Sequence, residues 1–202
     1  MTKNELKKER RIIYIISIIG IILDQITKFI IRYGFRTSCE QNICVTAPCP
    51  LNCLIDMINE GGTFQGLNVV PGRGIELIRN FFYIIEVKNT GGAWGIFSGN
   101  VAFLALISLF VIVLLYFFLR SEKSLNKISI TYYGFLFAGI IGNCIDRIVN
   151  GYVTDFLNFY IFGYDFPVFN IADILIVVGV GLMIIDVVRG ESHVIKERKR
   201  KC

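Results

Sequence analysis

Residues 101–119 read VAFLALISLFVIVLLYFFL, an apolar run that contains no charged side chain. A helix needs about 20 predominantly apolar residues to cross the hydrocarbon core of a bilayer, so this stretch predicts a membrane-spanning helix. The composition agrees, because 54% of the 202 residues are hydrophobic and only 18% are charged. Soluble domains carry about 25% charged residues, and disordered chains are far less apolar. Both of these classes are therefore excluded.

Three further stretches are long and apolar enough to cross a membrane, namely residues 12–31, 128–149 and 171–188. Each carries ionisable residues, which are costly inside a bilayer and usually functional. The first stretch follows basic residues, as a signal peptide does, but no small-residue cleavage site comes after it, so we interpret it as a retained helix. The sequence thus predicts an all-α membrane protein with four transmembrane helices, organised as a single polytopic domain over residues 1–202.

The basic residues are unevenly distributed along the chain. Of the 21 Lys and Arg residues, 14 lie before the first span, between the second and third spans, or after the fourth. Basic residues stay on the cytoplasmic side of membrane proteins, so both termini are expected in the cytoplasm. There the basic ends would attract anionic membrane lipids. No basic stripe is interleaved with aromatic residues outside the spans, so we expect no nucleic-acid partner.

Two segments between the spans are expected on the outer side. Residues 75–97 contain β-rich runs that are broken at Gly91-Gly92, and the aromatic stretch 156–169 has a possible hairpin at residues 163–165. Runs of this kind that are bounded by glycine are typical of short strands. We therefore expect a small extracytoplasmic β-rich element beside the four helices.

Residues 37–71 form a polar insertion that follows the first helix and contains four cysteines. On the outer, oxidising side of a membrane, disulfides between them are permitted, and four cysteines allow three pairings. Reduced thiols are an alternative. A metal site is a weaker one, because the C-x4-C-x4-C-x3-C spacing lacks the C-x2-C pairs that are typical of zinc sites. The possible disulfides involve Cys39, Cys44, Cys49 and Cys53.

Helix geometry brings several polar residues to a similar depth. With a rise of 1.5 Å per residue, Asp24, Asn143 and Asp173 each lie roughly 18–24 Å above the inner end of their helix. Asp24 and Lys28 are four residues apart and share a helix face. For this pair we favour structural support over a contact with substrate. Asp155 is expected in a short outer loop just beyond the third helix.

Two more groups share a helix face. Asn143, Asp146 and Arg147 are spaced by three and four residues on the third span. Asn170 precedes Asp173 by three residues at the start of the fourth span, where it is also a candidate N-cap. Arg147 has two interpretations: it marks the membrane interface, because arginine side chains extend toward water, or it holds substrate oxygens.

This group of polar residues lacks the usual catalytic bases and metal ligands. The only histidine, His193, lies in the C-terminal tail. A nucleophile activated by histidine and a zinc site are therefore not expected. Two neighbouring carboxylates can instead share one proton. One then activates water as a general base while the other protonates the leaving group. This chemistry hydrolyses peptide bonds without a metal ion. We therefore expect neither a metal nor a cofactor.

Four blocks of the sequence occur in an order and spacing that resembles the lipoprotein signal peptidase family (signal peptidase II), a family of intramembrane aspartic peptidases. These blocks are DQITK (24–28), NTGGAWGIF (89–97), GNCIDRIVNGYVTDF (142–156) and FNIADILI (169–176). The chain departs from the family pattern where Gly92 and Trp94 replace an alanine and a phenylalanine.

The resemblance implies a function and a set of site residues. Asp155 and Asp173 would be the catalytic pair of an aspartic endopeptidase. The substrate would be a lipidated prolipoprotein, cleaved before a diacylglyceryl-modified cysteine, and globomycin would be an inhibitor. The location would be the bacterial inner membrane, with the active site near its outer face. Site support or substrate binding would involve Asp24, Lys28, Asn89, Gly91, Asn143, Arg147 and Asn170.

Two other functions fit parts of the sequence. Intramembrane aspartates are also characteristic of proton- or cation-coupled transporters, but four helices without an inverted repeat suit alternating access poorly. A membrane assembly factor would use the polar residues to join helices, which leaves Asp155 unexplained.

Overall fold

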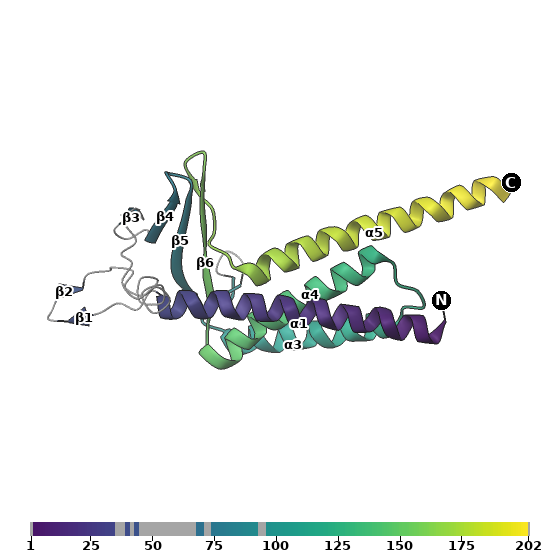
Figure 1. Ribbon diagram of the computed structural model, residues 1–202, viewed down its shortest axis with the longest axis horizontal. Helices are drawn as coiled ribbons and strands as arrows, with labels where there is room; N and C mark the ends of the chain where they lie inside the picture. The colour runs from purple at the N-terminus through teal and green to yellow at the C-terminus, as the bar shows by residue number, and fades with distance from the viewer. Residues whose placement is uncertain are drawn as a thin grey trace, which may run out of the picture. The chain divides into compact units, whose positions relative to one another are not determined.

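The computed structural model describes residues 2–34, 39–40, 43–44, 68–70, 74–92 and 96–201 (Figure 1). These residues belong to two compact units. The first unit comprises residues 1–23, 106–144 and 171–202, and the second comprises residues 24–105 and 145–170. In chain order the elements are α1 (Lys3–Gly34), β1 (Cys39–Glu40), β2 (Ile43–Cys44), β3 (Asn68–Val70), β4 (Gly74–Ile78), β5 (Phe82–Asn89), α3 (Val101–Ser121), α4 (Lys127–Asn150), β6 (Val153–Ile161), β7 (Tyr164–Asp165) and α5 (Ile171–Lys201).

Four helices in the described part of the chain are long and apolar enough to cross a membrane, which confirms the predicted fold class. Their candidate spans are Lys3–Arg32, Val101–Ser121, Lys127–Asn150 and Ile171–Arg189. The helices differ in how much of their apolar window is buried inside the protein, from 67% in α4 to 6% in α3. Helix α4 is therefore the most enclosed of the four, and α3 presents most of its apolar side chains outward.

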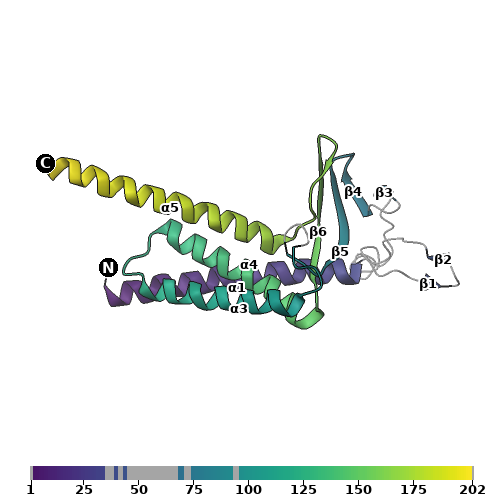
Figure 2. The same cartoon turned by 180° about the vertical axis from the view of Figure 1, so that it is seen from behind.

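The core of the first unit is built on α4. Ile13 of α1 and Leu119 of α3 are completely buried and pack in one cluster with large side chains of α4. Within this unit α1, α3 and α4 run side by side in both views (Figure 1 and Figure 2). The α4 members of the cluster include Tyr132, Tyr133, Leu136 and Phe137.

Glycines on α4 allow its neighbours to approach closely. A Cβ atom on Gly134 would overlap the side chain of Ile16 on α1, and one on Gly139 would overlap the carbonyl oxygen of Ala172 on α5. Small residues at such crossings are the usual means by which helices associate inside a bilayer. Gly139 thus allows the first turn of α5 to pack directly against α4.

The second unit contains an antiparallel sheet with the strand order β3-β4-β5-β6-β7. The predicted β-rich element is therefore present. Strands β6 and β7 are joined at Phe162 and Gly163, which both have positive φ angles, 50° and 83°. Two such residues are what a tight two-residue hairpin requires. The turn thus lies at the start of the predicted 163–165 hairpin.

One prediction about the site is wrong, because Asp155 lies on a strand and not in a loop. It is part of β6, where it pairs with Val87 of β5. The pairing joins segments that are far apart in the sequence, so no local spacing reveals it. The strand fixes the backbone of Asp155 more firmly than a loop would.

Little of the cysteine-bearing insertion is described. The backbone of β1 pairs antiparallel with that of β2, with Cys39 opposite Cys44. The side chains of these two cysteines, together with Cys49 and Cys53, lie outside the residues whose side chains the structure describes. The disulfides therefore stay a prediction.

Candidate active site

The carboxylate of Asp155 is buried and held by two asparagine side chains. Only 2% of the residue is exposed. Asn170 Nδ2 donates to Oδ1 of Asp155 over 2.6 Å, and Asn89 Nδ2 donates to Oδ2 over 2.8 Å. Both carboxylate oxygens therefore accept a hydrogen bond from a neutral amide. These donors fix the orientation of the group and stabilise its ionised form.

Asn89 is itself fixed by the turn that follows β5. Its Oδ1 accepts a hydrogen bond of 2.9 Å from the backbone N–H of Gly91, a typical asparagine turn. The carbonyl oxygen of Gly91 in turn accepts from Arg147 Nη2 on α4, over 3.3 Å. Arg147 is thus connected to Asp155 by a chain of hydrogen bonds that runs through the Gly91 turn and the side chain of Asn89. The structure therefore brings Gly91, Asn89 and Arg147, all predicted from the sequence as site residues, close to Asp155.

Asp173 is the third residue of α5 and has its own asparagine partner. Asn143 Nδ2, on α4, donates to Oδ1 of Asp173 over 2.8 Å. The close approach of α5 to α4 at Gly139, one turn before Asn143, permits this contact. A carboxylate in the first turn of a helix is also favoured by the helix dipole. Asp173 is partly exposed, and Asn143 is buried.

A buried group of charges lies in the second unit. Lys28 Nζ is 2.9 Å from an oxygen of Asp24 and 3.4 Å from one of Asp146, and all three side chains are fully buried. Arg32 Nη1 is 3.1 Å from the other oxygen of Asp146. The pair expected from the spacing of Asp24 and Lys28 is therefore present. It belongs to a larger network that joins α1 to α4.

Asp146 also fixes the start of the strand that carries Asp155. The backbone N–H of Thr154 donates to Asp146 Oδ2 over 3.0 Å, and Asn150 Nδ2 donates to its Oδ1 over 3.2 Å. Each oxygen of Asp146 thus has two partners. Arg32 was not predicted from the sequence, although it continues the four-residue series of Asp24 and Lys28. The backbone contact at Thr154 had no signal in the sequence.

One ionisable group of the sheet, outside the spans, has a shifted pKa. Burial raises the pKa of the Glu86 carboxyl on β5 above its ordinary value, while the positive charges of Lys88 and Arg32 act in the opposite direction. Glu86 therefore takes up a proton at higher pH than an exposed glutamate does. Among the described residues, no group of three or more His, Cys, Asp and Glu side chains could hold a metal ion.

The arrangement suits acid–base chemistry. Asp155 and Asp173 each receive a hydrogen bond from an asparagine amide, which can donate to a carboxylate without competing for its proton.

The model of the family described as "Signal peptidase (SPase) II" matches residues 16–189. The chain belongs to the signal peptidase II family. The resemblance found in the four sequence blocks is thereby confirmed.

Curated members of the signal peptidase II family are similar over most of their length. The lipoprotein signal peptidase of Staphylococcus haemolyticus (strain JCSC1435) is 40% identical over 132 residues, which are 65% of this chain and 82% of that protein. The lipoprotein signal peptidase of Staphylococcus aureus (strain JH9) is 41% identical over 122 residues, 60% of this chain and 75% of that protein.

Two solved structures of bacterial membrane enzymes, both determined by the in meso method, have a similar fold. The one at 2.3 Å resolution superposes with a TM-score of 0.66 at 31% identity and covers 90% of each chain. The one at 1.9 Å resolution gives a TM-score of 0.61 at 32% identity and covers 87% of this chain and 91% of the other. As a member of the signal peptidase II family, the chain is a membrane protease and not a transporter.

Proposed function

We propose that this chain removes the signal peptide of prolipoproteins by cleaving before a diacylglyceryl-modified cysteine, with Asp155 and Asp173 as its catalytic pair. The observation that carries the proposal is the buried carboxylate of Asp155, held on both oxygens by Asn89 and Asn170. Asp155 and Asp173 are also the aspartates of the two family blocks, VTDF and FNIAD. In this proposal residues 1–202 act as one polytopic domain.

The proposed mechanism is aspartic peptide hydrolysis. The ionised carboxylate takes a proton from a water molecule, whose oxygen attacks the carbonyl carbon of the scissile peptide bond. The second, protonated carboxyl group hydrogen-bonds to the carbonyl oxygen and stabilises the tetrahedral intermediate. When the C–N bond breaks, a proton passes to the leaving amine of the lipidated cysteine. Two adjacent carboxyl groups that share one proton supply both roles.

The asparagines and the arginine would act as positioning residues. Asn89 and Asn170 keep both oxygens of Asp155 in a fixed orientation, and Asn143 does the same for one oxygen of Asp173. Arg147 holds the Gly91 turn. We assign Asp24 and Lys28 to structural support, because they form a fully buried ion pair.

We further propose the bacterial cell membrane as the location, with both termini cytoplasmic and the site near the outer face. The support is the distribution of 14 of the 21 basic residues at the two ends and between the second and third spans. In this orientation the acyl chains of the substrate and of membrane lipids would surround the helices. The scissile bond would then lie near the outer interface, and globomycin would compete for the site.

The proposal predicts that Asp155→Asn and Asp173→Asn each lose cleavage by about 10²- to 10⁴-fold, the usual contribution of a general acid or base. Purified variants would be assayed on a diacylglyceryl-modified lipopeptide, with and without globomycin and with and without EDTA. Asp165→Asn is the matched control, because Asp165 lies on the neighbouring strand β7 and is exposed. Its activity should stay within about twofold of wild type, as for most surface changes.

Two results would contradict the proposal. Cleavage above about a tenth of wild type in either variant would remove that residue from the catalytic pair, given the expected size of the loss. Complete inactivation by EDTA with recovery on adding zinc would replace the aspartic mechanism by a metal-dependent one.

A further inference from the structure

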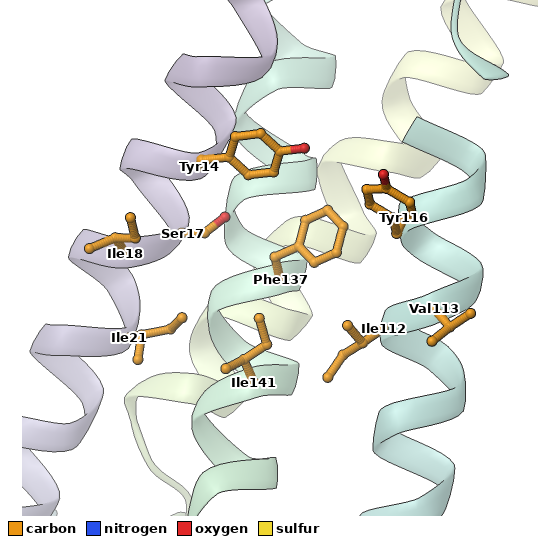
Figure 3. Close-up of a pocket in the computed structure, with 9 residues that line it drawn as sticks. All are labelled: Tyr14, Ser17, Ile18, Ile21, Ile112, Val113, Tyr116, Phe137 and Ile141. Carbon is orange, nitrogen blue, oxygen red and sulfur yellow. The ribbon is translucent and has the colours of Figure 1, made fainter. Parts of the chain in front are cut away.

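The first unit contains an apolar groove of about 490 Å³ between α1, α3 and α4. Figure 3 shows side chains from all three helices pointing into it. The volume lies within the range of pockets that hold small ligands. The lining residues are Tyr14, Ser17, Ile18, Ile21, Ile112, Val113, Tyr116, Phe137 and Ile141.

The groove has a buried floor and an exposed rim. Ser17 and Phe137 form the floor, where only 5% and 6% of the residues are exposed. The rim includes Ile18 and Val113, which are about half exposed. The hydroxyl of Ser17 already donates to the carbonyl oxygens of Ile13 and Gly134. A polar ligand group would lose its hydrogen bonds to water on entering the groove and would find no new partner there. The floor therefore favours an apolar occupant.

One end of the groove carries two tyrosines and lies next to basic residues. Tyr14 and Tyr116 lie at the same end, as Figure 3 shows. Arg10 precedes Tyr14 by four residues on α1, and Arg120 follows Tyr116 by four residues on α3. Residues four apart share a helix face. Both arginines therefore lie one turn beyond the tyrosines, at the same end of the groove.

Arg10 connects α1 to the end of α3, and one of its N–H groups has no hydrogen-bond partner among the described residues. Its Nη2 donates to the carbonyl oxygens of Leu119 and Arg120, over 3.2 and 3.1 Å. Its Nε is buried and has no hydrogen-bond partner among the described residues. A buried donor of this kind costs free energy unless an acceptor reaches it. The side chain of Arg120 is exposed.

We infer that the groove binds an anionic phospholipid, with one acyl chain along the floor and the phosphate at Arg10 and Arg120. The distance along α1 from Tyr14 to Ile21 is about 10 Å, which suits a stretch of acyl chain lying parallel to the helices. The hydrocarbon makes the apolar contacts, the tyrosine hydroxyls border the headgroup region, and the phosphate lies against the guanidinium groups of Arg10 and Arg120. In the proposed topology this lipid belongs to the cytoplasmic leaflet.

The inference is independent of the proposed catalytic pair, and lipid retention tests it directly. The full-length chain, purified in detergent, is mixed with phosphatidylglycerol or phosphatidylcholine of identical acyl chains and examined by native mass spectrometry. One phosphatidylglycerol should be retained per chain, with roughly 30-fold preference over phosphatidylcholine, as two basic contacts of about 1 kcal/mol each would give.

Four variants distinguish lipid binding in the groove from nonspecific lipid retention. Ile18→Trp fills the groove and should abolish retention, whereas Ile19→Trp adds the same bulk on α1 at a half-exposed residue outside the groove and should retain the lipid. Val113→Trp fills the groove from α3 and serves if Ile18→Trp unfolds. Arg120→Gln should weaken phosphatidylglycerol roughly fivefold and leave phosphatidylcholine unchanged.

Several outcomes overturn the inference. Equal retention of the two lipids would show that the headgroup does not contact the arginines. Equal retention in the Ile18→Trp and Ile19→Trp variants would show that the lipid does not bind in the groove. A raised KM for the lipopeptide in the Ile18→Trp variant, with lipid retention unchanged, identifies the substrate as the occupant. A changed oligomeric mass with lipid retention unchanged identifies a second copy of the chain.

Discussion

Asparagine side chains hold both aspartates that we propose as the catalytic pair. A side-chain amide donates a hydrogen bond but does not titrate near neutral pH, so it orients a carboxylate without taking its proton. Asp155 receives two such bonds and Asp173 receives one from Asn143. The same kind of neutral donor therefore orients both carboxyl groups.

Removing one of these amides should slow catalysis without abolishing binding. We predict that Asn89→Ala lowers kcat by about 10- to 100-fold, the value of a hydrogen bond to a charged group, while KM changes less. Steady-state kinetics on the lipopeptide measure this split. Asn158→Ala is the control, because it also removes an amide donor to an aspartate. Asn158 donates to Asp165, which lies outside the proposed catalytic pair. A loss that is confined to KM would show that Asn89 contacts the substrate instead.

At the scale of elements, the contact between α4 and α5 decides where Asp173 lies. We predict that Gly139→Val loses most of the cleavage activity, because the added carbons overlap Ala172 and Ile176 of α5 and displace Asn143 from Asp173. Gly181→Val is the control, since no atom lies within 4 Å of a Cβ built there. Both variants should insert into membranes, as measured by fractionation. Full activity of the Gly139→Val variant would show that α5 tolerates a shift.

The charge network offers a second test at this scale. We predict that Lys28→Met lowers the free energy of unfolding by about 3–5 kcal/mol, because Asp24 and Asp146 remain buried without their shared cation. Thermal unfolding in detergent, with Lys88→Met as an exposed control, measures the change. Adding Asp24→Asn to the Lys28→Met variant should recover part of the loss. No recovery would mean that Asp24 has another cationic partner.

The sequence predicted contacts within a helix better than contacts between elements. The Asp24–Lys28 pair follows from a spacing of four residues, and it is present. The pairing of Asp155 with Val87, and the bond from Thr154 to Asp146, join segments that no local period connects. Asp155 was therefore expected in a loop although it lies on a strand. The contact between Gly91 and Arg147 could not be predicted from spacing either, because it links a turn to a distant helix.

At the scale of the whole molecule, the distribution of charge sets the orientation in the membrane. We predict that reporters fused before Thr2 and after Cys202 are active only in the cytoplasm, because the basic residues at both ends resist translocation. A reporter inserted within residues 37–71 should be active only outside and serves as the opposite control. Extracytoplasmic activity of the C-terminal fusion would invert the topology and place the proposed site on the wrong face.

Asp146 has a consequence for how the protein loses its structure. Its carboxylate contacts Lys28 and Arg32 of α1, Asn150 of its own helix, and the backbone N–H of Thr154 at the start of β6. Fraying at the start of β6 would remove one hydrogen bond from this buried carboxylate, which costs free energy even though Lys28, Arg32 and Asn150 stay bound to it. Because Asp146 links all three segments, we expect the ends of α1 and α4 and the start of β6 to lose their structure in one cooperative step. Heat should leave molecules either active or fully unfolded in this region, with no populated intermediate in which only the Asp155 strand has come loose.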